Sequence, residues 1–155
     1  MSSMSAIQDF LAQKRIAVIG VSRDPKDISR SLLKEFRSRG YEALAVNPAL
    51  AEADGTPCYA HVRDIEPPVD TALLMTPANV TEEVVRECAD AKVKHVWMYR
   101  AGTTGGAVSE DAVRFCESQG MSVIPGECPY MFLPKAGCVH WMHGFIRKIT
   151  GKYPR

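Results

Sequence analysis

Five short apolar runs recur along the chain and are rich in Val, Ile and Leu. They span residues 16–19, 43–46, 71–75, 95–99 and 122–124. None of them alternates cleanly between apolar and polar positions, as a strand with one solvent-exposed face would. Continuous apolar strands are typical of a sheet that is covered on both faces, which is the situation of parallel strands. The pattern therefore predicts five parallel strands.

Helical periodicity follows the first of these runs. Ile28, Leu32 and Phe36 recur every four residues, and Leu33 joins their face of the helix. Gly40 is placed to end this helix, because glycine is the usual residue just beyond a helix C-terminus. We expect the shared face to be buried against the sheet.

Two further helical patterns lie in the second half of the chain. One is expected to open with Asn79 and Glu82, which resemble a capping box. Its buried stripe is predicted to consist of Val80, Val84, Cys88 and Ala91. The other spans about residues 109–119 and ends at Gly120. Its inward positions are predicted to be Ala112, Val113 and Cys116.

The remaining segments complete a single domain over residues 1–155. A helix over about residues 5–14 precedes the first strand, and a last helix over about residues 140–149 follows the fifth. The proline-rich segment 47–69 predicts a loop with one short helical turn. The alternation of strands and helices predicts an α/β fold: a Rossmann-like, doubly wound, mostly parallel five-stranded sheet with helices on both faces.

Charge and cysteine content narrow the class of protein. The formal net charge of +1 predicts a partner that is neither nucleic acid nor a membrane surface. No acidic residue follows Glu127, so the basic C-terminal stretch either holds an anion, docks on an acidic neighbour or forms a solvated helix. Five cysteines at wide spacings, with no signal peptide and no apolar span, indicate reduced thiols and a cytoplasmic protein.

Candidate chemistry is expected where each strand ends, because ligands of open α/β sheets bind outside the carboxyl ends of the strands. The residues that follow the five runs are nearly all small, proline or polar. They are 20–23, 47–48, 76–79, 100–103 and 125–128. Such residues allow the close backbone approach that a flat ligand and a pyrophosphate need.

The loop after the first run carries most of this expectation. Gly20 is suited to a tight turn, and Ser22 offers a hydroxyl beside exposed amides. The following helix directs the positive end of its dipole at the loop, and Lys26 and Arg30 add full charges. We expect the loop to bind phosphate.

The same loop argues against a dinucleotide. Ser22 and Pro25 occupy the positions of the second and third glycines of G-x-G-x-x-G, and the second strand ends in Asn47–Pro48 rather than an acidic residue. The Gly-Lys-Ser/Thr ending of a P-loop is also absent from the sequence.

An ordered set of short motifs resembles the CoA-binding domain family, which is similar to the N-terminal domain of the succinyl-CoA synthetase alpha subunit. The set comprises 18–22, 40–41, 46–48, 69–70, 76–77 and 126–128. The resemblance covers about residues 14–128. It implies coenzyme A, or an acyl-CoA, as the ligand.

The resemblance also implies roles for individual residues. Gly20, Val21 and Ser22 would contact the phosphates, helped by Lys26 and Arg30. The other residues that it implies around the ligand are Asn47 and Pro48 at the nucleotide end, Met75, Thr76, Pro77 and Val80 beside adenine or pantetheine, and Gly102 along the pantetheine arm. The synthetase's phosphorylated histidine belongs to a second domain, so its catalysis is not implied here.

We therefore predict a binding module for coenzyme A, with no catalytic residue assigned. The alternatives are a small NAD(P)- or ATP-using enzyme and a subunit of a ligase-like complex. Its protein partner would be a second copy of this chain, in a homodimer, or a ligase-like subunit.

Two apolar features have structural interpretations. The apolar run 128–134 would cross the sheet edge or form a dimer contact. Trp97 is expected in the core.

A minority hypothesis places a zinc site near the C-terminus. Cys128, Cys138, His140 and His143 supply the thiolate and imidazole groups that zinc prefers, although their spacing is not that of a zinc knuckle. The other interpretation is two surface histidines and two small buried thiols. Cys128 follows a strand end and is expected to be structural or to line the ligand site, the alternative being a nucleophile or a partner of the CoA thiol.

Overall fold

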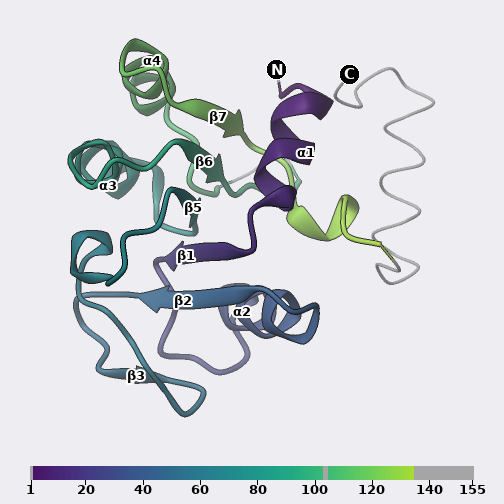
Figure 1. The fold of residues 1–155 in the computed structure, drawn as a ribbon, viewed down its shortest axis with the longest axis vertical. Coiled ribbons are helices and arrows are strands. Elements are labelled where there is room, and N and C mark those ends of the chain that lie inside the picture. The colour runs from purple at the N-terminus through teal and green to yellow at the C-terminus, as the bar shows by residue number, and fades with distance from the viewer. Residues whose placement is uncertain (1, 103–104, 135–155) are drawn as a thin grey trace.

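The protein is built on one parallel sheet in the computed structural model, which describes residues 2–102 and 105–134 (Figure 1). The strands are β1 (Arg15–Ile19), β2 (Glu42–Val46), β5 (Thr71–Leu74), β6 (His95–Met98) and β7 (Ser122–Pro125). They lie in the order β2-β1-β5-β6-β7, and every pair is parallel. All five predicted strands and the Rossmann-like α/β fold are confirmed.

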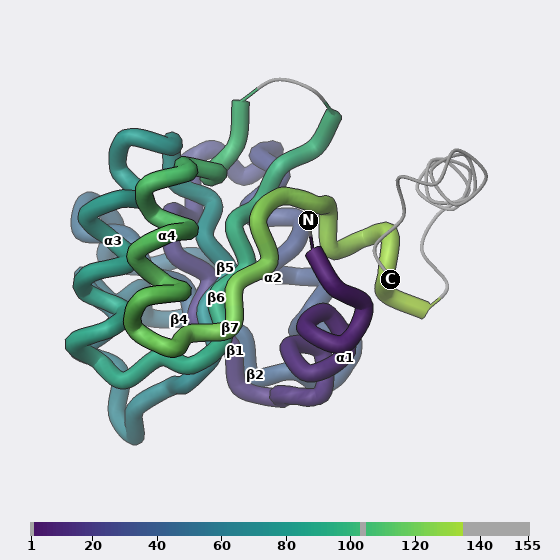
Figure 2. The backbone as a smooth tube through the Cα atoms, turned by 90° about the horizontal axis from the view of Figure 1, so that it is seen from above, coloured from purple at the N-terminus to yellow at the C-terminus, as the bar shows by residue number. Residues whose placement is uncertain are grey.

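Helices cover both faces of this sheet, as the continuous apolar strands require. They are α1 (Met4–Ala12), α2 (Ile28–Ser38), α3 (Ala78–Asp90) and α4 (Glu110–Ser118). The strand residues that face α1 and α2 form one buried cluster with them, and those that face α3 and α4 form another. Seen from above in Figure 2, α3 and α4 lie on one side of the sheet and α1 on the other.

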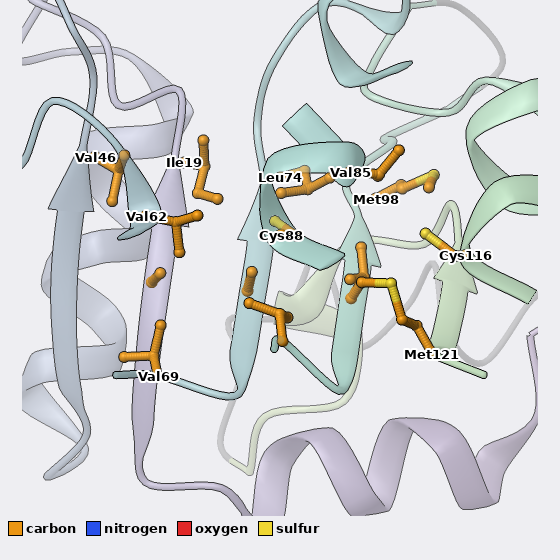
Figure 3. Packing of buried hydrophobic residues seen from close by; sticks show 14 of the residues in the cluster. Ile19, Val46, Val62, Val69, Leu74, Val85, Cys88, Met98, Cys116 and Met121 are labelled. Atoms are coloured by element: carbon orange, nitrogen blue, oxygen red, sulfur yellow. The ribbon is translucent and has the colours of Figure 1, made fainter. Parts of the chain in front are cut away.

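Successive residues of each strand point to opposite faces of the sheet and so belong to different clusters. Leu74 and Met98 pack with Val85, Cys88 and Cys116 under α3 and α4 (Figure 3). On the other face, the side chain of Trp97 is fully buried, so the prediction of a core position is confirmed. Its ring lies edge-on to that of Phe10 of α1, with 5.1 Å between centroids.

The apolar run 128–134 packs over the α1 side of the sheet. It contains the 3₁₀ turn η2 (Pro129–Met131). Leu133 is buried, and the ring centroid of Phe132 lies 5.9 Å from that of Trp97. This run contributes to the protein's own core, because large apolar side chains there cover Trp97.

Two details of the helix predictions are wrong. Ile28 and Val80 are exposed, and the buried stripe of α3 consists of Thr81, Val85 and Cys88. The capping box is absent, because Pro77 is the N-cap residue and makes no side-chain cap bond. The buried face of α3 is thus shifted by one residue from the predicted stripe at its first two positions, and Cys88 belongs to both.

The other helix predictions agree more closely with the structure. Leu32, Leu33 and Phe36 are buried in α2, and Ala112 and Cys116 are buried in α4. Val84, Ala91 and Val113 are only partly buried. Ser109 caps α4 by accepting a hydrogen bond from the Ala112 amide at 3.3 Å.

The segment between β2 and β5 contains the expected helical turn, η1 (Val62–Asp64), and an unexpected hairpin. The hairpin consists of β3 (Glu52–Ala53) and β4 (Thr56–Pro57), which pair antiparallel. Asp54 and Gly55 form its two-residue turn with φ of +52° and +76°. Positive φ at both positions is the geometry of a tight hairpin turn, for which Asp-Gly is a preferred sequence.

Two further expectations concern residues at the C-terminus and membrane insertion. The helix expected at residues 140–149 lies outside the described residues. In residues 2–102 and 105–134, no helix has the length and apolar character that a membrane span requires.

Candidate functional site

The topological switch point of the sheet lies between β1 and β5. From β1 the chain passes through α2 to β2 on one side, whereas the chain from β5 passes through α3 to β6 on the other. Helices α2 and α3 lie on opposite faces, and the loops that lead into them separate at this point, which is where ligands of open α/β sheets bind. We take the loops that leave the carboxyl ends of β1, β2 and β5 as the candidate site.

Gly20 brings the first of these loops against the third. Its φ is +92°, and a Cβ atom built on it would lie 3.0 Å from the carbonyl carbon of Met75 and 3.0 Å from the amide nitrogen of Thr76. That separation is tighter than most real Cβ contacts, so main-chain atoms of the neighbouring loop would have to move. Only glycine fits both the backbone conformation and the space.

Side chains hold the loop that follows, residues 20–27, which we call the first loop. The Ser22 amide donates to Ser29 Oγ at 2.9 Å, and the Asp24 amide donates to Ser22 Oγ at 3.1 Å. Asp27 is the N-cap of α2 and accepts from the Ser29 amide at 2.8 Å. The Asp27 carboxylate thus already accepts from one of the free amides at the start of α2, which we expected to face a phosphate. The side chain of Lys26 is exposed.

Arg30 lies behind the first loop and is 7% exposed. Its Nε and Nη2 donate to the two carboxylate oxygens of Asp54, at 3.0 Å and 2.8 Å, while Nη1 donates to the Ser22 carbonyl at 3.2 Å. The hydrogen bond to Arg30 lowers the pKa of Asp54 and raises that of Arg30. Two-point contact with a carboxylate is the strong form of this pair. The guanidinium therefore links the hairpin to the first loop.

Asn47, at the end of β2, also binds the first loop. Its Nδ2 donates to the Val21 carbonyl at 2.8 Å, and its Oδ1 accepts from the Ala49 amide at 2.8 Å. Val21 is fully buried, and Pro48 beside Asn47 is exposed. The asparagine predicted at the nucleotide end thus connects two loops of the carboxyl edge.

The loop after β5 is partly apolar. Thr76 is buried and its hydroxyl lies 2.7 Å from that of Thr81, while Pro77 is exposed and Met75 is half-buried. Among the described residues, Val80 and Ile28 are the large apolar residues that are exposed, at 40% and 37%. They lie in the first turns of the two helices that start from this edge. Their exposure leaves apolar surface beside the switch point.

The carboxyl ends of β6 and β7 lie farther along the same edge. Gly102 belongs to the loop after β6, two strands from β1, with φ of +71°. Cys128 is buried, and burial raises the pKa of its thiol. Burial, followed by the neighbouring Cys128, also raises the pKa of Tyr99 to about 12. A thiol kept protonated is a weak nucleophile, which favours the lining role over the nucleophilic one.

The zinc hypothesis lies mostly beyond the described residues. Cys138, His140 and His143 are outside them. Within the described part of the chain, no three His, Cys, Asp or Glu side chains are grouped so as to hold a metal ion.

A cavity of about 280 Å³ opens at the outer edge of β2. Arg37, Tyr41, Ala43, Thr56 and Tyr59 are among the residues that line it. Arg37 crosses it from α2, donating to the Ala43 carbonyl and to the Thr56 hydroxyl, each at 2.9 Å. None of the residues predicted for the ligand site lines this cavity, so we keep the switch point as the candidate site.

The structure thus brings several predicted residues into direct contact. Gly20 meets Thr76, Asn47 binds Val21, and Arg30 binds Ser22. Asp54 was not predicted, although it forms a two-point ion pair with Arg30. The signal for its position was the Asp-Gly turn, but nothing local in the sequence connects that turn to Arg30.

The curated proteins that are similar to this chain include both long ligases and a short protein of about the same length. The chain is 30% identical over 120 residues to the ADP-forming acetate–CoA ligase I of Archaeoglobus fulgidus, a match covering 74% of this chain and 18% of the ligase. It is 28% identical over 127 residues to the uncharacterized protein YneT of Bacillus subtilis, covering 81% of this chain and 90% of YneT. The chain therefore spans under a fifth of that ligase but nearly all of YneT.

Solved structures give the same picture. A conserved hypothetical protein from Pyrococcus furiosus matches with a TM-score of 0.66 and 34% identity, covering 74% of this chain and 95% of that one. An acetyl-coenzyme A synthetase of Ca. Korarchaeum cryptofilum, solved with phosphate and ADP, matches with a TM-score of 0.62 and 31% identity. That match covers 71% of this chain and 25% of the synthetase.

A family model described as a CoA binding domain matches residues 14–134. The match includes every residue predicted for the ligand site and all five strands of the parallel sheet. By this match the chain belongs to the CoA-binding domain family.

Proposed function

We propose that this protein binds coenzyme A, or an acyl-CoA, at the switch point and acts as a non-catalytic binding module. The observation that carries the proposal is the family match over residues 14–134. The geometry supports it, because Gly20 lets the loops after β1 and β5 meet closely at the switch point. Ligands of open α/β sheets bind at that point.

We assign each residue of the site to one part of the coenzyme. Gly20, Val21 and Ser22 approach the phosphates, Lys26 contributes an exposed charge, and Arg30 acts on the loop from behind. The remaining members of the proposed site are Asn47 and Pro48 at the nucleotide end, with Met75, Thr76, Pro77, Val80 and Gly102 along adenine and pantetheine. The exposure of Val80 supports its place there, because it offers apolar contact area to the ligand.

Thermal-shift measurements with CoA, acetyl-CoA, NAD, NADP and ATP test the proposal. A ligand at one hundred times its Kd stabilises the folded state by about 2.7 kcal/mol, so binding is readily seen. CoA or acetyl-CoA should raise Tm. A rise with NAD, NADP or ATP and none with CoA would favour the nucleotide-using enzyme instead.

A variant pair tests the placement. Lys26→Gln should weaken CoA binding several-fold, because an exposed cation close to a phosphate raises affinity. Lys94→Gln removes another exposed lysine, which precedes β6 at the opposite end of the sheet. It should bind CoA as the wild type does. Equal affinities of the two variants in calorimetry would contradict phosphate binding at the first loop.

A protein partner is part of the same proposal. One of the similar proteins is the alpha subunit of an ADP-forming acetate–CoA ligase II from Pyrococcus furiosus, of which this chain matches 27%. We infer that a ligase-like subunit, or a second copy of this chain, is the partner. Failure of every nucleotide to raise Tm in the isolated chain would favour a site that needs this partner. The cytoplasmic location expected from the cysteine pattern completes the proposal.

A further inference from the structure

Three consecutive peptide groups of the first loop differ in how their amides are used. The Ser22 amide donates to Ser29 Oγ, and the Asp24 amide donates to Ser22 Oγ. Between them, the Arg23 amide makes no hydrogen bond with any residue in 2–102 or 105–134. Arg23 itself is exposed. Neither the Arg23 amide nor that of the buried Val21 has a hydrogen-bond partner within the described chain, and of these two residues Arg23 is the exposed one.

The direction of that donor is set by the carbonyl on the same peptide plane. A trans peptide is planar, so the Ser22 carbonyl and the Arg23 N–H point in opposite directions. Arg30 Nη1 holds this carbonyl at 3.2 Å, and lies 3.5 Å from the next carbonyl, that of Arg23. The Arg23 N–H is consequently aimed away from the guanidinium.

Asp54 in turn fixes the guanidinium. Its two carboxylate oxygens accept from Nε and Nη2, which leaves Nη1 for the loop. The side chains of Arg30 and Asp54 are only 9% and 19% exposed, so water competes weakly for this pair. Lys34 reaches the same carboxylate at 3.4 Å, but its side chain is 55% exposed. The buried pair, rather than the outer one, determines where Arg30 lies.

We propose that Asp54 is a positioning residue, which acts through Arg30 to aim the Arg23 main-chain N–H at a phosphate of the bound coenzyme. This inference rests on the proposed function, because it names a donor and its support within the same site. The β3–β4 hairpin thereby acquires a role in binding, since it carries the carboxylate that orders the first loop. A preorganised donor binds an anion more tightly, since less ordering remains to be done on binding.

The variant Asp54→Asn tests whether Asp54 positions Arg30. The amide keeps the shape of the side chain but has a single acceptor and no charge, so it cannot hold both guanidinium nitrogens. We expect the Kd for CoA to rise about tenfold by calorimetry, the order of effect of a lost charge-assisted hydrogen bond. Lys34→Ala, the matched control, removes only the outer contact to the same carboxylate and should bind CoA with wild-type affinity.

Nitrogen-15 NMR gives a readout that a purely structural role would not move. The Arg23 amide resonance should shift strongly when CoA is added to the wild type, and less in Asp54→Asn at saturation. If Asp54→Asn does not fold, Arg30→Lys takes its place, because a single ammonium cannot hold Asp54 and the Ser22 carbonyl in the same fork. The same loss of affinity is expected.

The outcomes separate this inference from the proposed function. Absence of CoA binding by the wild type would overturn both. Wild-type binding with an unmoved Arg23 amide, or with unchanged affinity in the folded Asp54 or Arg30 variant, would overturn the inference alone. Weakened binding in the variant together with an intact Lys34→Ala control would support it.

Discussion

The loops that leave β1 and β6 differ in what fixes the backbone of their described residues. In the first loop, side chains of Asn47 and Arg30 hold the carbonyls of Val21 and Ser22. In the loop after β6, by contrast, glycines at 102, 105 and 106 adopt φ between +70° and +94°. The chain then returns to β6, where the Ala107 amide donates to the Tyr99 carbonyl at 2.7 Å.

This difference shows what each loop can do. Glycines permit a reversal of the chain but do not fix the direction of each peptide, because they make no side-chain bonds. Side-chain donors on consecutive carbonyls fix the peptide planes, and with them the opposite N–H groups. Of these two loops, as far as their residues are described, the first is the one in which side chains set the direction of consecutive peptides, which agrees with the proposal that phosphates bind there.

Gly106→Ala should produce the largest loss of stability. An added Cβ would lie 2.5 Å from the Tyr99 carbonyl oxygen, at a φ of +94°. We expect the free energy of unfolding to fall by about 3 kcal/mol, from steric overlap added to backbone strain. Gly102→Ala is the control, since its φ is +71° but nothing lies within 4 Å of the added atom. A loss of about 1 kcal/mol is expected there. Equal losses in urea unfolding would contradict steric overlap at Gly106.

Gly20→Ala should have the next largest effect on stability and a larger one on binding. The added Cβ would lie 3.0 Å from main-chain atoms of Met75 and Thr76, so the loops after β1 and β5 would be forced apart. We expect a loss of about 2 kcal/mol in the free energy of unfolding, with CoA binding weakened at least tenfold. Gly40→Ala has a similar φ of +87° and open space around the Cβ. It should lose about 1 kcal/mol and bind CoA normally.

Asn47→Ala removes one of the two side chains that donate hydrogen bonds to carbonyls of the first loop. The Val21 carbonyl loses its donor, so we expect a loss of about 1 kcal/mol in the free energy of unfolding and a several-fold weaker affinity for CoA. Asn79→Ala removes an exposed asparagine from the first turn of α3 and should change stability by less than about 0.5 kcal/mol. A first loop that depends on glycine alone would leave the stability of Asn47→Ala at the wild-type value.

The parts of this molecule that were predictable from sequence are those governed by short-range patterns. The five apolar runs gave the strands, and the spacing of Leu32, Leu33 and Phe36 gave the buried face of α2. The prediction for Val80 failed because the buried face of α3 consists of Thr81, Val85 and Cys88, and the apolar spacing alone did not distinguish that face from the neighbouring one. Asp54–Gly55 is a sequence that favours a hairpin turn, but the segment around it was predicted to be a loop because it is rich in proline.

The position of the candidate loops at the strand ends was predictable from the sequence, but the side-chain contacts between them were not. The rule for parallel sheets pointed to residues 20–23, 47–48 and 76–79, and these do lie at neighbouring strand ends. Arg30 was expected to face the ligand, yet its partner stands 24 residues away in a hairpin. Such a pairing depends on tertiary packing, so no spacing in the sequence could reveal it.

The smallest expected effect concerns acid, and it tests whether the first loop depends on a charge. The hydrogen bond from Arg30 lowers the pKa of Asp54 below its usual value of 3.8. The folded state therefore holds this carboxylate ionised where the unfolded chain already binds a proton, so the contribution of Asp54 is complete above about pH 5 and declines as the pH falls below 4.

Urea unfolding of the wild type and Asp54→Asn at pH 6, 4 and 3 measures that decline. With a further measurement at pH 5, the difference in free energy of unfolding between the two proteins should be constant from pH 6 to pH 5 and shrink toward pH 3. The loop after β6 has no such pair in its described residues, so the loss in Gly106→Ala should be the same at pH 6 and pH 4. If the difference between the wild type and Asp54→Asn were equally large at pH 3, Asp54 would stabilise the loop through its shape rather than its charge.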